Sequence, residues 1–343
     1  MKKQSGAFLL GAAIFICAFL FPEKFTEGVK NGLLLSANTV VPSLFVFICA
    51  SSIIASGGMP DLFKKAAKPV MKLLALPAEA FPAVFLGLFA GYPTGAKMTE
   101  ELFESGRISH RQAERMLRFC VSPGIGFSVN AVGIMMLGSK KSGIIILISV
   151  CISSLMIGFF SAAGEKADGD PTDEMRTKSP DEALVYGVSS GAESMLKICG
   201  FVAAFSGIGE IIALIPVNEK AKILLQCFLE VTGGCAKAVS SVPLPITAGI
   251  CAFGGICIHT QIFSICGECK IKKFEFILFR LIHAALSTLV CIIILNYFPV
   301  EADVISIQTE RLVINSFSFP ASVSLMFLAS LIILDLDNGR KMC

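Results

Sequence analysis

The sequence predicts an all-α polytopic membrane protein with about eight transmembrane helices plus two re-entrant hairpins, arranged as an inverted repeat. Three observations lead to this fold class. Of the 343 residues, 54% are hydrophobic and only 16% are charged, a composition far from that of a soluble domain. Apolar runs long enough to cross a hydrocarbon core of about 30 Å recur along the chain. Finally, short fragments of the first half return in the second half in the same order.

The apolar runs leave little sequence for a soluble domain. They cover residues 7–21, 31–57, 78–96, 117–137, 143–163, 183–215, 223–240, 245–266, 275–298 and 318–336. The net charge is only +3 and no block of like charge is present, so nothing indicates nucleic acid as a partner. The lipid bilayer is the expected environment, and assembly into a homo-oligomer is left open.

The chain begins with two lysines and an apolar run, "MKKQSGAFLLGAAIFICAFLF". This pattern is shared by cleaved signal peptides and by first transmembrane helices. No small-x-small cleavage site follows and further apolar runs do, which favours an uncleaved N-terminal helix within residues 1–27. Lys2 and Lys3 would then hold the N-terminus in the cytosol.

Basic residues lie on both sides of the apolar run 78–96. They are Lys64, Lys65, Lys68 and Lys72 before it, and Lys97, Arg107, Arg111, Arg115 and Arg118 after it. A full crossing would put one cluster outside, which the positive-inside rule disfavours. We therefore expect 78–96 to enter from the cytosol, turn near "GYPTG" and return. If 223–240 is re-entrant from the opposite side, eight helices cross and both termini are cytosolic.

Three fragments recur in order: "GVKNG" (28–32) with "GVSSG" (187–191), "FLGLFAG" (85–91) with "FLEVTGG" (228–234), and "GFSVNA" (126–131) with "GICIHT" (255–260). They predict two repeats, with three full crossings in each, so the second must be inverted. The expected units are the N-terminal helix 1–27, a first repeat 28–164, a polar cytosolic linker 165–182, a second repeat 183–300, and a C-terminal helix and tail 301–343. Inverted repeats with interrupted segments are typical of secondary transporters.

The string "GYPTGAK" gives the candidate substrate site. A helix broken in the membrane persists only where it is buried in protein or lines a polar cavity. Pro93 removes a backbone donor, Thr94 adds a hydroxyl, and the freed amides with Lys97 form a cradle for an anion. Gly91 and Gly95 permit close approach, and Tyr92 completes the motif. The alternative is a tight helix-to-loop turn with Lys97 at the membrane interface.

The second half offers a matching set of polar residues in "LEVTGGCAK", namely Glu230, Thr232, Gly233 and Gly234. Glu230 has no close basic neighbour in sequence, so it is a candidate for coupling to a proton or cation. Asn130 and His259 occupy corresponding repeat positions, with Ser122 and Gln261 nearby, and could face one another across the pseudo-twofold axis. A lone membrane histidine is otherwise a packing residue.

Two further pairs of polar side chains lie within apolar runs. Glu193 and Lys197 are spaced to pair on one helix face, in either a structural or a functional role. Arg280 and His283 could reach the interface or complete an anion site.

A third polar feature is the segment "RISHRQAERMLRF", which has a capping box formed by Ser109 and Gln112. This box predicts a cytosolic helix whose arginines 111, 115 and 118 face lipid headgroups.

Nothing in the sequence indicates an enzyme, a metal or a cofactor. The 13 cysteines are mostly scattered through apolar runs, as reduced cysteines are. Only "CGEC" (266–269) has metal or redox spacing, and it lacks a second pair or a nearby histidine. No Ser/His/Asp arrangement, phosphate-binding loop, HExxH motif or dinucleotide fingerprint is present.

The strings "GYPTGAK", "GRIS", "LRFCVSPGIGF", "LEVTGG", "FGGICIHTQ" and "RLIHA" together resemble the sporulation integral membrane protein family of the YlbJ or SpoVV type, within the Gate or nucleoside-recognition domain group. The resemblance covers roughly residues 28–300. It departs in "FCVSPGIGF", where the family has a more polar run. The resemblance implies a fold similar to concentrative nucleoside transporters. It also implies movement of dipicolinate, a small aromatic dianion, across the outer forespore membrane during sporulation.

Transport of a small organic anion is therefore the expected function. A dianion needs donors and positive potential, which Lys97 and a free helix N-terminus supply. A nucleoside would instead use amide and carboxylate groups such as those of Asn130, Glu230 and Gln261. The alternatives are thus a nucleoside or other small-solute transporter, and a non-transporting membrane scaffold for spore maturation.

Overall fold

The computed structural model describes residues 2–57, 59–165, 178–267 and 271–300. Every regular element in these ranges is a helix, and no strand occurs among them. The predicted C-terminal unit 301–343, with its crossing at 318–336, lies outside the described residues. So does most of the predicted linker, whose last three residues belong to the helix that follows it.

The first half of the chain forms eight α-helices and three short irregular helices. They are α1 (Lys2–Leu20), α2 (Pro22–Leu35), the π-helical turn η1 (Ser36–Val40), α3 (Val41–Gly57), α4 (Asp61–Leu73), the 3₁₀ turn η2 (Ala78–Ala80), α5 (Phe81–Phe89), α6 (Tyr92–Glu104), α7 (His110–Phe119), the π-helical segment η3 (Gly126–Met136) and α8 (Lys140–Ser161). The second half forms α9 (Pro180–Ile212), α10 (Glu219–Leu229), α11 (Val231–Ala238), α12 (Leu244–Phe253), α13 (Gly255–Ile265) and α14 (Lys273–Tyr297).

Five helical stretches of the described chain are long and apolar enough to cross a membrane. They are Pro22–Gly57, Lys140–Ser161, Pro180–Ile212, Leu244–Ile265 and Lys273–Tyr297. A sixth is obtained if Leu62–Leu73 and Ala78–Phe89, which are bent by 95°, count as one. The eight predicted crossings are thus reached only in part, because the first run yields a shorter apolar helix, Gly11–Leu20.

Two runs that were predicted as continuous crossings are interrupted. In 117–137, α7 ends at Phe119 and the chain continues through Pro123 and Gly124, whose φ is +67°. In 245–266, the helix breaks at Gly254 and Gly255, with φ of +82° and +75°. Proline lacks the amide that a helix needs, and glycine alone adopts positive φ at little cost. The sequence analysis treated both runs as crossings and identified neither break, and the second run, Leu244–Ile265, is still long and apolar enough to cross a membrane.

The break predicted at "GYPTG" is confirmed. α5 ends at Phe89 and α6 begins at Tyr92, with Gly91 at a φ of +124°. The two helices fold back on each other, since a Cβ at Gly95 would lie 2.8 Å from the Cα of Gly87. The second half contains a matching hairpin, α10–α11, whose turn is at Glu230.

In each half, the hairpin crosses an interrupted segment at the point where both are broken. The carbonyl oxygen of Cys120 fills the space that a Cβ at Gly87 or Gly95 would need. A Cβ at Gly255 would come within 3.2 Å of the carbonyl oxygens of Cys227 and Leu229. Free backbone groups of one break therefore lie against those of the other, away from lipid, as a membrane protein requires.

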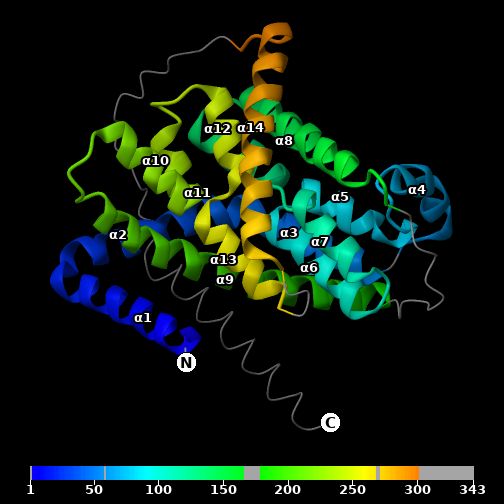
Figure 1. Cartoon of the computed structure of the whole chain (residues 1–343), viewed down its shortest axis with the longest axis horizontal. Coiled ribbons are helices and arrows are strands. Elements are labelled where there is room, and N and C mark those ends of the chain that lie inside the picture. Colours follow the sequence, from blue (N-terminus) through cyan, green and yellow to red (C-terminus); the bar gives the residue numbers. More distant parts are fainter. Residues whose placement is uncertain (1, 58, 166–177, 268–270, 301–343) are drawn as a thin grey trace.

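Helix α9 packs along α2 and α3 (Figure 1). The fragments "GVKNG" and "GVSSG" lie in this interface. Gly28 and Gly32 contact the α9 backbone near Ser206, whereas Gly187 and Gly191 contact α3 near Cys49. Each fragment thus supplies the glycines that let the other half approach closely.

Candidate functional site

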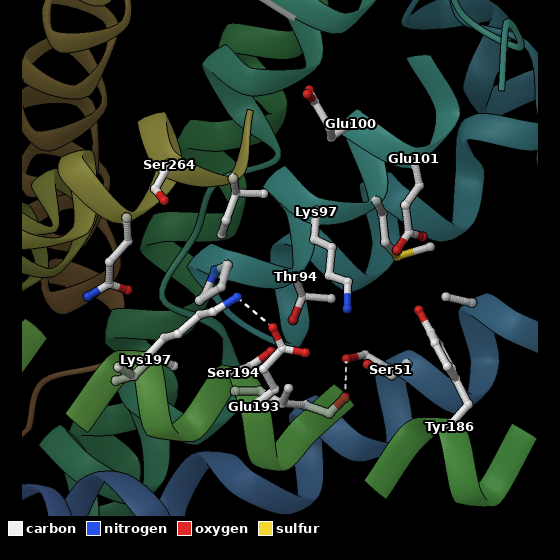
Figure 2. Close-up of a pocket in the computed structure, with 18 of the residues that line it drawn as sticks. Ser51, Thr94, Lys97, Glu100, Glu101, Tyr186, Glu193, Ser194, Lys197 and Ser264 are labelled. Atoms are coloured by element: carbon white, nitrogen blue, oxygen red, sulfur yellow. Dashed lines mark hydrogen bonds and ion pairs between the residues drawn. The ribbon is translucent and has the colours of Figure 1, made fainter. Parts of the chain in front are cut away.

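A cavity of about 440 Å³ lies between α3, α6, α9 and α13. Side chains from all four helices line it, including Thr94 and Lys97 from α6 and Gln261 from α13. Figure 2 shows Thr94, Lys97, Tyr186 and Glu193 directed towards a common space. A volume of this size suits a small solute.

The break at Gly91 sets the inner end of this cavity. Because α6 starts there, Thr94 and Lys97 come in its first turns and, three residues apart, share one face. Thr94 is buried, whereas Glu101 and Glu104, farther along α6, are exposed. Glu100, which also lines the cavity, is as buried as Thr94. The cavity therefore has a hydroxyl and a carboxylate at depth, Lys97 between, and two carboxylates near its mouth.

Lys97 is held by a hydroxyl and an aromatic ring, with a carboxylate nearby. Its Nζ donates to the Oγ of Ser190 at 2.5 Å and lies 5.8 Å from the centroid of the Tyr186 ring. Glu101, four residues farther along α6, interacts with it electrostatically. The Lys97 ammonium group therefore lies in the lining of the cavity, close to the carboxylates of α6.

Hydroxyl groups line much of the remaining wall. On α9, Tyr186 and Ser194 line the cavity, and Ser51 of α3 faces the same space. Ser190, midway between them at four-residue intervals, is bonded to Lys97. Each hydroxyl can both donate and accept a hydrogen bond. Sequence reasoning missed this face of α9, although the spacing of Tyr186, Ser190 and Ser194 was the signal that could have revealed it.

Carboxylates outnumber ammonium groups in the lining. Glu193 and Lys197 form the predicted pair, with 2.7 Å between Oε1 and Nζ. Both side chains are more than half exposed, so the pair contributes little to stability. The other charged lining residues are Lys97 and the three glutamates of α6, Glu100, Glu101 and Glu104.

A small void of about 30 Å³ lies where the breaks of both halves meet. It is lined by Gly91, Pro93, Pro123, Thr232 and Gln261, among others. Two of these, Pro93 and Gln261, also line the large cavity. The void is therefore the innermost point at which the two hairpins and both interrupted segments come together.

A second cavity, of about 270 Å³, lies between α2, α10, α11 and the C-terminal part of α9. Gly233 and Gly234 of the second hairpin line it, as does Lys237. The Nζ of Lys237 pairs with the Oε1 of Glu210 on α9 at 2.9 Å. Lys237 follows the turn of the second hairpin as Lys97 follows the turn of the first, so each hairpin brings one lysine to one cavity.

Glu230 caps a helix in the structure. Its carboxylate accepts hydrogen bonds from the backbone amides of Thr232 (2.7 Å) and Gly233 (2.6 Å) at the start of α11. It is buried and lines the second cavity rather than the first. The two amides satisfy both of its oxygens, which gives the residue a capping role at the turn.

Three other predicted site residues lie away from both cavities. The Nε2 of His259 is 2.9 Å from the carbonyl oxygen of Phe253, and its ring packs edge-on against Phe253 and Phe276. Ser122 is fully buried in the loop after α7, and Asn130 is half-buried on η3. The breaks that precede η3 and α13 turn these segments into the protein, so the structure does not bring Asn130 and His259 to one ligand site.

Tyr92 joins the two halves instead of facing the large cavity. Its hydroxyl donates to the carbonyl of Cys251, and its ring lies 6.2 Å from that of Phe127. Only the small void reaches it. Its role in the structure is therefore to fix the first hairpin against α12.

Arg280 neither reaches an interface nor faces a cavity. Its guanidinium is buried and donates to the carbonyls of Arg118 and Val121, at the break after α7. The neighbouring His283 is hydrogen-bonded to Ser154 through Nε2 at 3.0 Å. The two residues satisfy backbone and side-chain groups of the interrupted segment, in place of the predicted anion site.

The helix predicted for "RISHRQAERMLRF" is present as α7, with its capping box of Ser109 and Gln112. Two of its three arginines face protein, whereas the Arg111 side chain is 76% exposed. Arg115 is buried and donates to the carbonyls of Leu74 and Ala75, and Arg118 pairs with Glu275. Backbone carbonyls at the end of α4 account for this difference from the prediction.

The "CGEC" pair is described only in part. Cys266 is buried, with its Sγ 3.7 Å from the carbonyl oxygen of Ala96, whereas Cys269 lies outside the described residues. Within the described chain, no group of three or more His, Cys, Asp or Glu side chains could hold a metal ion.

Comparison with known proteins gives one relative. The chain is similar to the sporulation integral membrane protein YlbJ of Bacillus subtilis (strain 168), with 22% identity in an alignment 308 residues long that covers 76% of this chain and 75% of the relative. No family model matches the chain. No solved structure matches it either. The relative's name refers to sporulation and to the membrane. The long apolar helices of this chain are consistent with a membrane protein.

Proposed function

We propose that this chain is a sporulation membrane protein that works as a secondary transporter. Its cargo is a small organic anion, with dipicolinate as the candidate, and the membrane it crosses is the outer forespore membrane. The observation that carries the proposal is the large cavity, which ends at a broken helix and has the Lys97 ammonium group in its lining, bonded to the hydroxyl of Ser190. A scaffold would need neither the break nor this charge.

The arrangement of the two halves supports transport. Two hairpins, two interrupted segments and two glycine fragments occur in matching places, as an inverted repeat requires. The cavities lie along different parts of α9 and approach the same void between the breaks. Rocking of one half against the other would open each cavity in turn to opposite sides of the membrane.

The cargo would bind with its negative charge near Lys97. There, Thr94, Ser190 and the first amides of α6 can donate hydrogen bonds to a carboxylate. The glutamates at the mouth favour a second candidate, a nucleoside or another neutral polar solute, because they accept hydrogen bonds and repel an anion. Gln261 would then bind the base, whereas Asn130 lies too far from the cavity lining to serve.

Uptake by reconstituted protein decides between these functions. Proteoliposomes are loaded with purified chain and offered labelled dipicolinate or uridine, and uptake is compared with empty liposomes. We expect Lys97→Gln to abolish dipicolinate uptake while the protein stays folded and inserted. Lys197→Gln is the matched control, because Lys197 lines the same cavity but is exposed and paired with Glu193, and it should retain most of the uptake.

Three other outcomes would each reject part of the proposal. Normal dipicolinate uptake by Lys97→Gln would remove the anion site. Uridine uptake alone would establish the nucleoside candidate. If folded protein moves no small anion and no nucleoside, the scaffold alternative stands.

A further inference from the structure

The ring of Tyr186 on α9 contacts two ammonium groups at the wall of the large cavity. The Nζ of Lys97 lies 5.8 Å from the ring centroid, and the Nζ of Lys178 lies 4.9 Å from it. Both distances are within the range of cation–π contacts. Lys97 belongs to α6, whereas Lys178 belongs to the segment just before α9. Figure 2 shows Tyr186 and Lys97 directed towards the same space.

Local contacts hold the ring and both lysines in place. The Nζ of Lys97 donates to the Oγ of Ser190, one turn along α9, and Ser190 also hydrogen-bonds the Tyr186 hydroxyl. The backbone amide of Lys178 donates to the carbonyl of Ser56, near the end of α3, at 3.1 Å. Ser190 is buried, whereas Tyr186 is only half-buried. The ring is thus fixed by its hydroxyl end and remains open to the cavity that it lines.

Carboxylates also lie near this ring. Glu101 interacts electrostatically with both Lys97 and Tyr186, and Glu193 interacts with Tyr186. Both glutamates repel an anion, so an anionic ligand needs contact with both ammonium groups to offset them. A charge-assisted hydrogen bond to a carboxylate is stronger than a cation–π contact at a partly exposed ring. Each lysine would therefore exchange the ring for a carboxylate of the ligand.

We propose that Tyr186, together with Lys97 and Lys178, makes the large cavity selective for a planar aromatic ring that carries two carboxylates. This inference rests on the proposed function, in which the cavity takes a small organic anion. The ring of the cargo stacks on Tyr186, and each carboxylate becomes the partner of one ammonium group. An aliphatic dicarboxylate has the same charge but cannot form the aromatic pair. An aromatic monocarboxylate forms the pair but leaves one lysine on the ring.

Three small carboxylates separate these features. Dipicolinate has the ring and two carboxylates, glutarate has two carboxylates without a ring, and picolinate has the ring with one carboxylate. The sequence contains no tryptophan, so Tyr186→Trp keeps an aromatic face and introduces a single fluorescent reporter. The purified variant in lipid nanodiscs is titrated with dipicolinate, with excitation at the red edge of the indole band. Glutarate and picolinate are then measured by displacement of dipicolinate.

We expect saturable quenching of the Tyr186→Trp reporter by dipicolinate. Its dissociation constant should be about fivefold lower than that of glutarate, which is the scale of one aromatic pair. The control reporter is Leu289→Trp on α14, at a position that is 53% exposed in the parent chain. Its emission should show no saturable change with any of the three carboxylates.

Calorimetric titration of variants assigns the preference to individual side chains. Tyr186→Phe should keep the preference for dipicolinate over glutarate, whereas Tyr186→Leu should bind the two equally. Lys178→Gln should reduce the preference for dipicolinate over picolinate about threefold, the scale of one exposed charge pair, and Lys178→Arg should keep it. Lys197→Gln is the matched control, because Lys197 lines the same cavity but is paired with Glu193. Each result is a ratio of two dissociation constants, so a loss of folded protein does not imitate the effect.

An unchanged preference for dipicolinate over glutarate in Tyr186→Leu would overturn the inference. Binding of all three carboxylates without preference for the ring would also reject it, while the proposed anion cargo would stand. If the folded parent protein binds none of the three, the anion cargo itself fails and this inference falls with it. The binding measurements require no transport, so they separate selectivity from the outcome of the uptake experiment.

Discussion

The two hairpins share an architecture and differ in what their turns hold. The first turn, at Gly91, is capped by no carboxylate and opens on a cavity with the Lys97 ammonium group in its lining. The second turn is capped by Glu230, and its lysine, Lys237, is paired with Glu210. The first cavity is also the larger, at about 440 Å³ against 270 Å³. The lysine of the second half is thus joined to a carboxylate by a salt bridge, whereas the lysine of the first half is hydrogen-bonded to a hydroxyl.

Side-specific labelling tests whether the hairpins enter from opposite sides. Lys72→Cys and Arg107→Cys flank the first hairpin, and both should react with an impermeant maleimide from the cytosolic side only. The control is Lys220→Cys beside the second hairpin, which should react from the outside. All variants require a background with the native cysteines replaced. Labelling of Arg107→Cys only from outside would mean that the first hairpin crosses fully, and the inverted repeat would be lost.

The close approach at the first break should be intolerant of any side chain. Gly95→Val places a Cβ on the carbonyl oxygen of Cys120, where only backbone could give way. We expect a loss of about 3 kcal/mol or more, which is the scale of severe overpacking. Size-exclusion chromatography after detergent extraction should show aggregated protein. Gly200→Ala is the control, because nothing lies within 4 Å of its added Cβ, and it should remain monodisperse.

Each hairpin has a threonine close to its turn, Thr94 in the first and Thr232 in the second, which allows the two turns to be compared. Thr94→Val removes a hydroxyl from the large cavity and should weaken cargo binding by about 0.5–1.5 kcal/mol, or roughly 2- to 12-fold in KM. Thr232→Val should change KM less, because Thr232 lines only the small void. Concentration-dependent uptake measures both. A larger effect at Thr232 would place the binding site at the second hairpin.

The ion pair between Lys237 and Glu210 in the second cavity should contribute the least to stability. Lys237 is about half exposed, so breaking the pair with Glu210→Gln should cost about 0–1 kcal/mol. We expect this variant to raise maleimide labelling of Asn31→Cys in the second cavity modestly. Exchanging the two charges, Glu210→Lys with Lys237→Glu, should restore the parent level. Unchanged labelling in Glu210→Gln would show that the pair does not keep this cavity closed.

The sequence predicted the first hairpin turn because two glycines, a proline and a lysine interrupt an otherwise apolar run. The breaks at Pro123–Gly124 and Gly254–Gly255 carry similar residues, yet hydropathy stays high on both sides, so length and apolarity suggested continuous helices. Which way a broken segment turns depends on tertiary contacts such as that between Gly95 and Cys120. Composition and spacing do not encode those contacts locally.

The residues of the candidate site also fall into those that the local sequence indicates and those that depend on tertiary packing. Thr94 and Lys97 were found because they belong to the visible break, and Gln261 because it follows a conspicuous histidine. Ser190 and Tyr186 were missed because the face of α9 that lines the cavity depends on where α3 and α6 pack. His259 was predicted to contact the ligand, whereas in the structure its ring is hydrogen-bonded to the carbonyl of Phe253. The local sequence does not distinguish a buried histidine with a backbone partner from one that binds a ligand.

Arg280 has a consequence for how the chain is built. On insertion scales, a charged residue at the centre of an isolated helix costs about 2.5–3.5 kcal/mol, and α14 contains this arginine within its apolar length. The carbonyls that satisfy its guanidinium belong to Arg118 and Val121, about 160 positions earlier. They have left the ribosome long before α14 is synthesised. The first half therefore supplies the hydrogen-bond acceptors for Arg280 of α14, the last described helix. We expect insertion of α14 to depend on the earlier folding of the interrupted segment after α7.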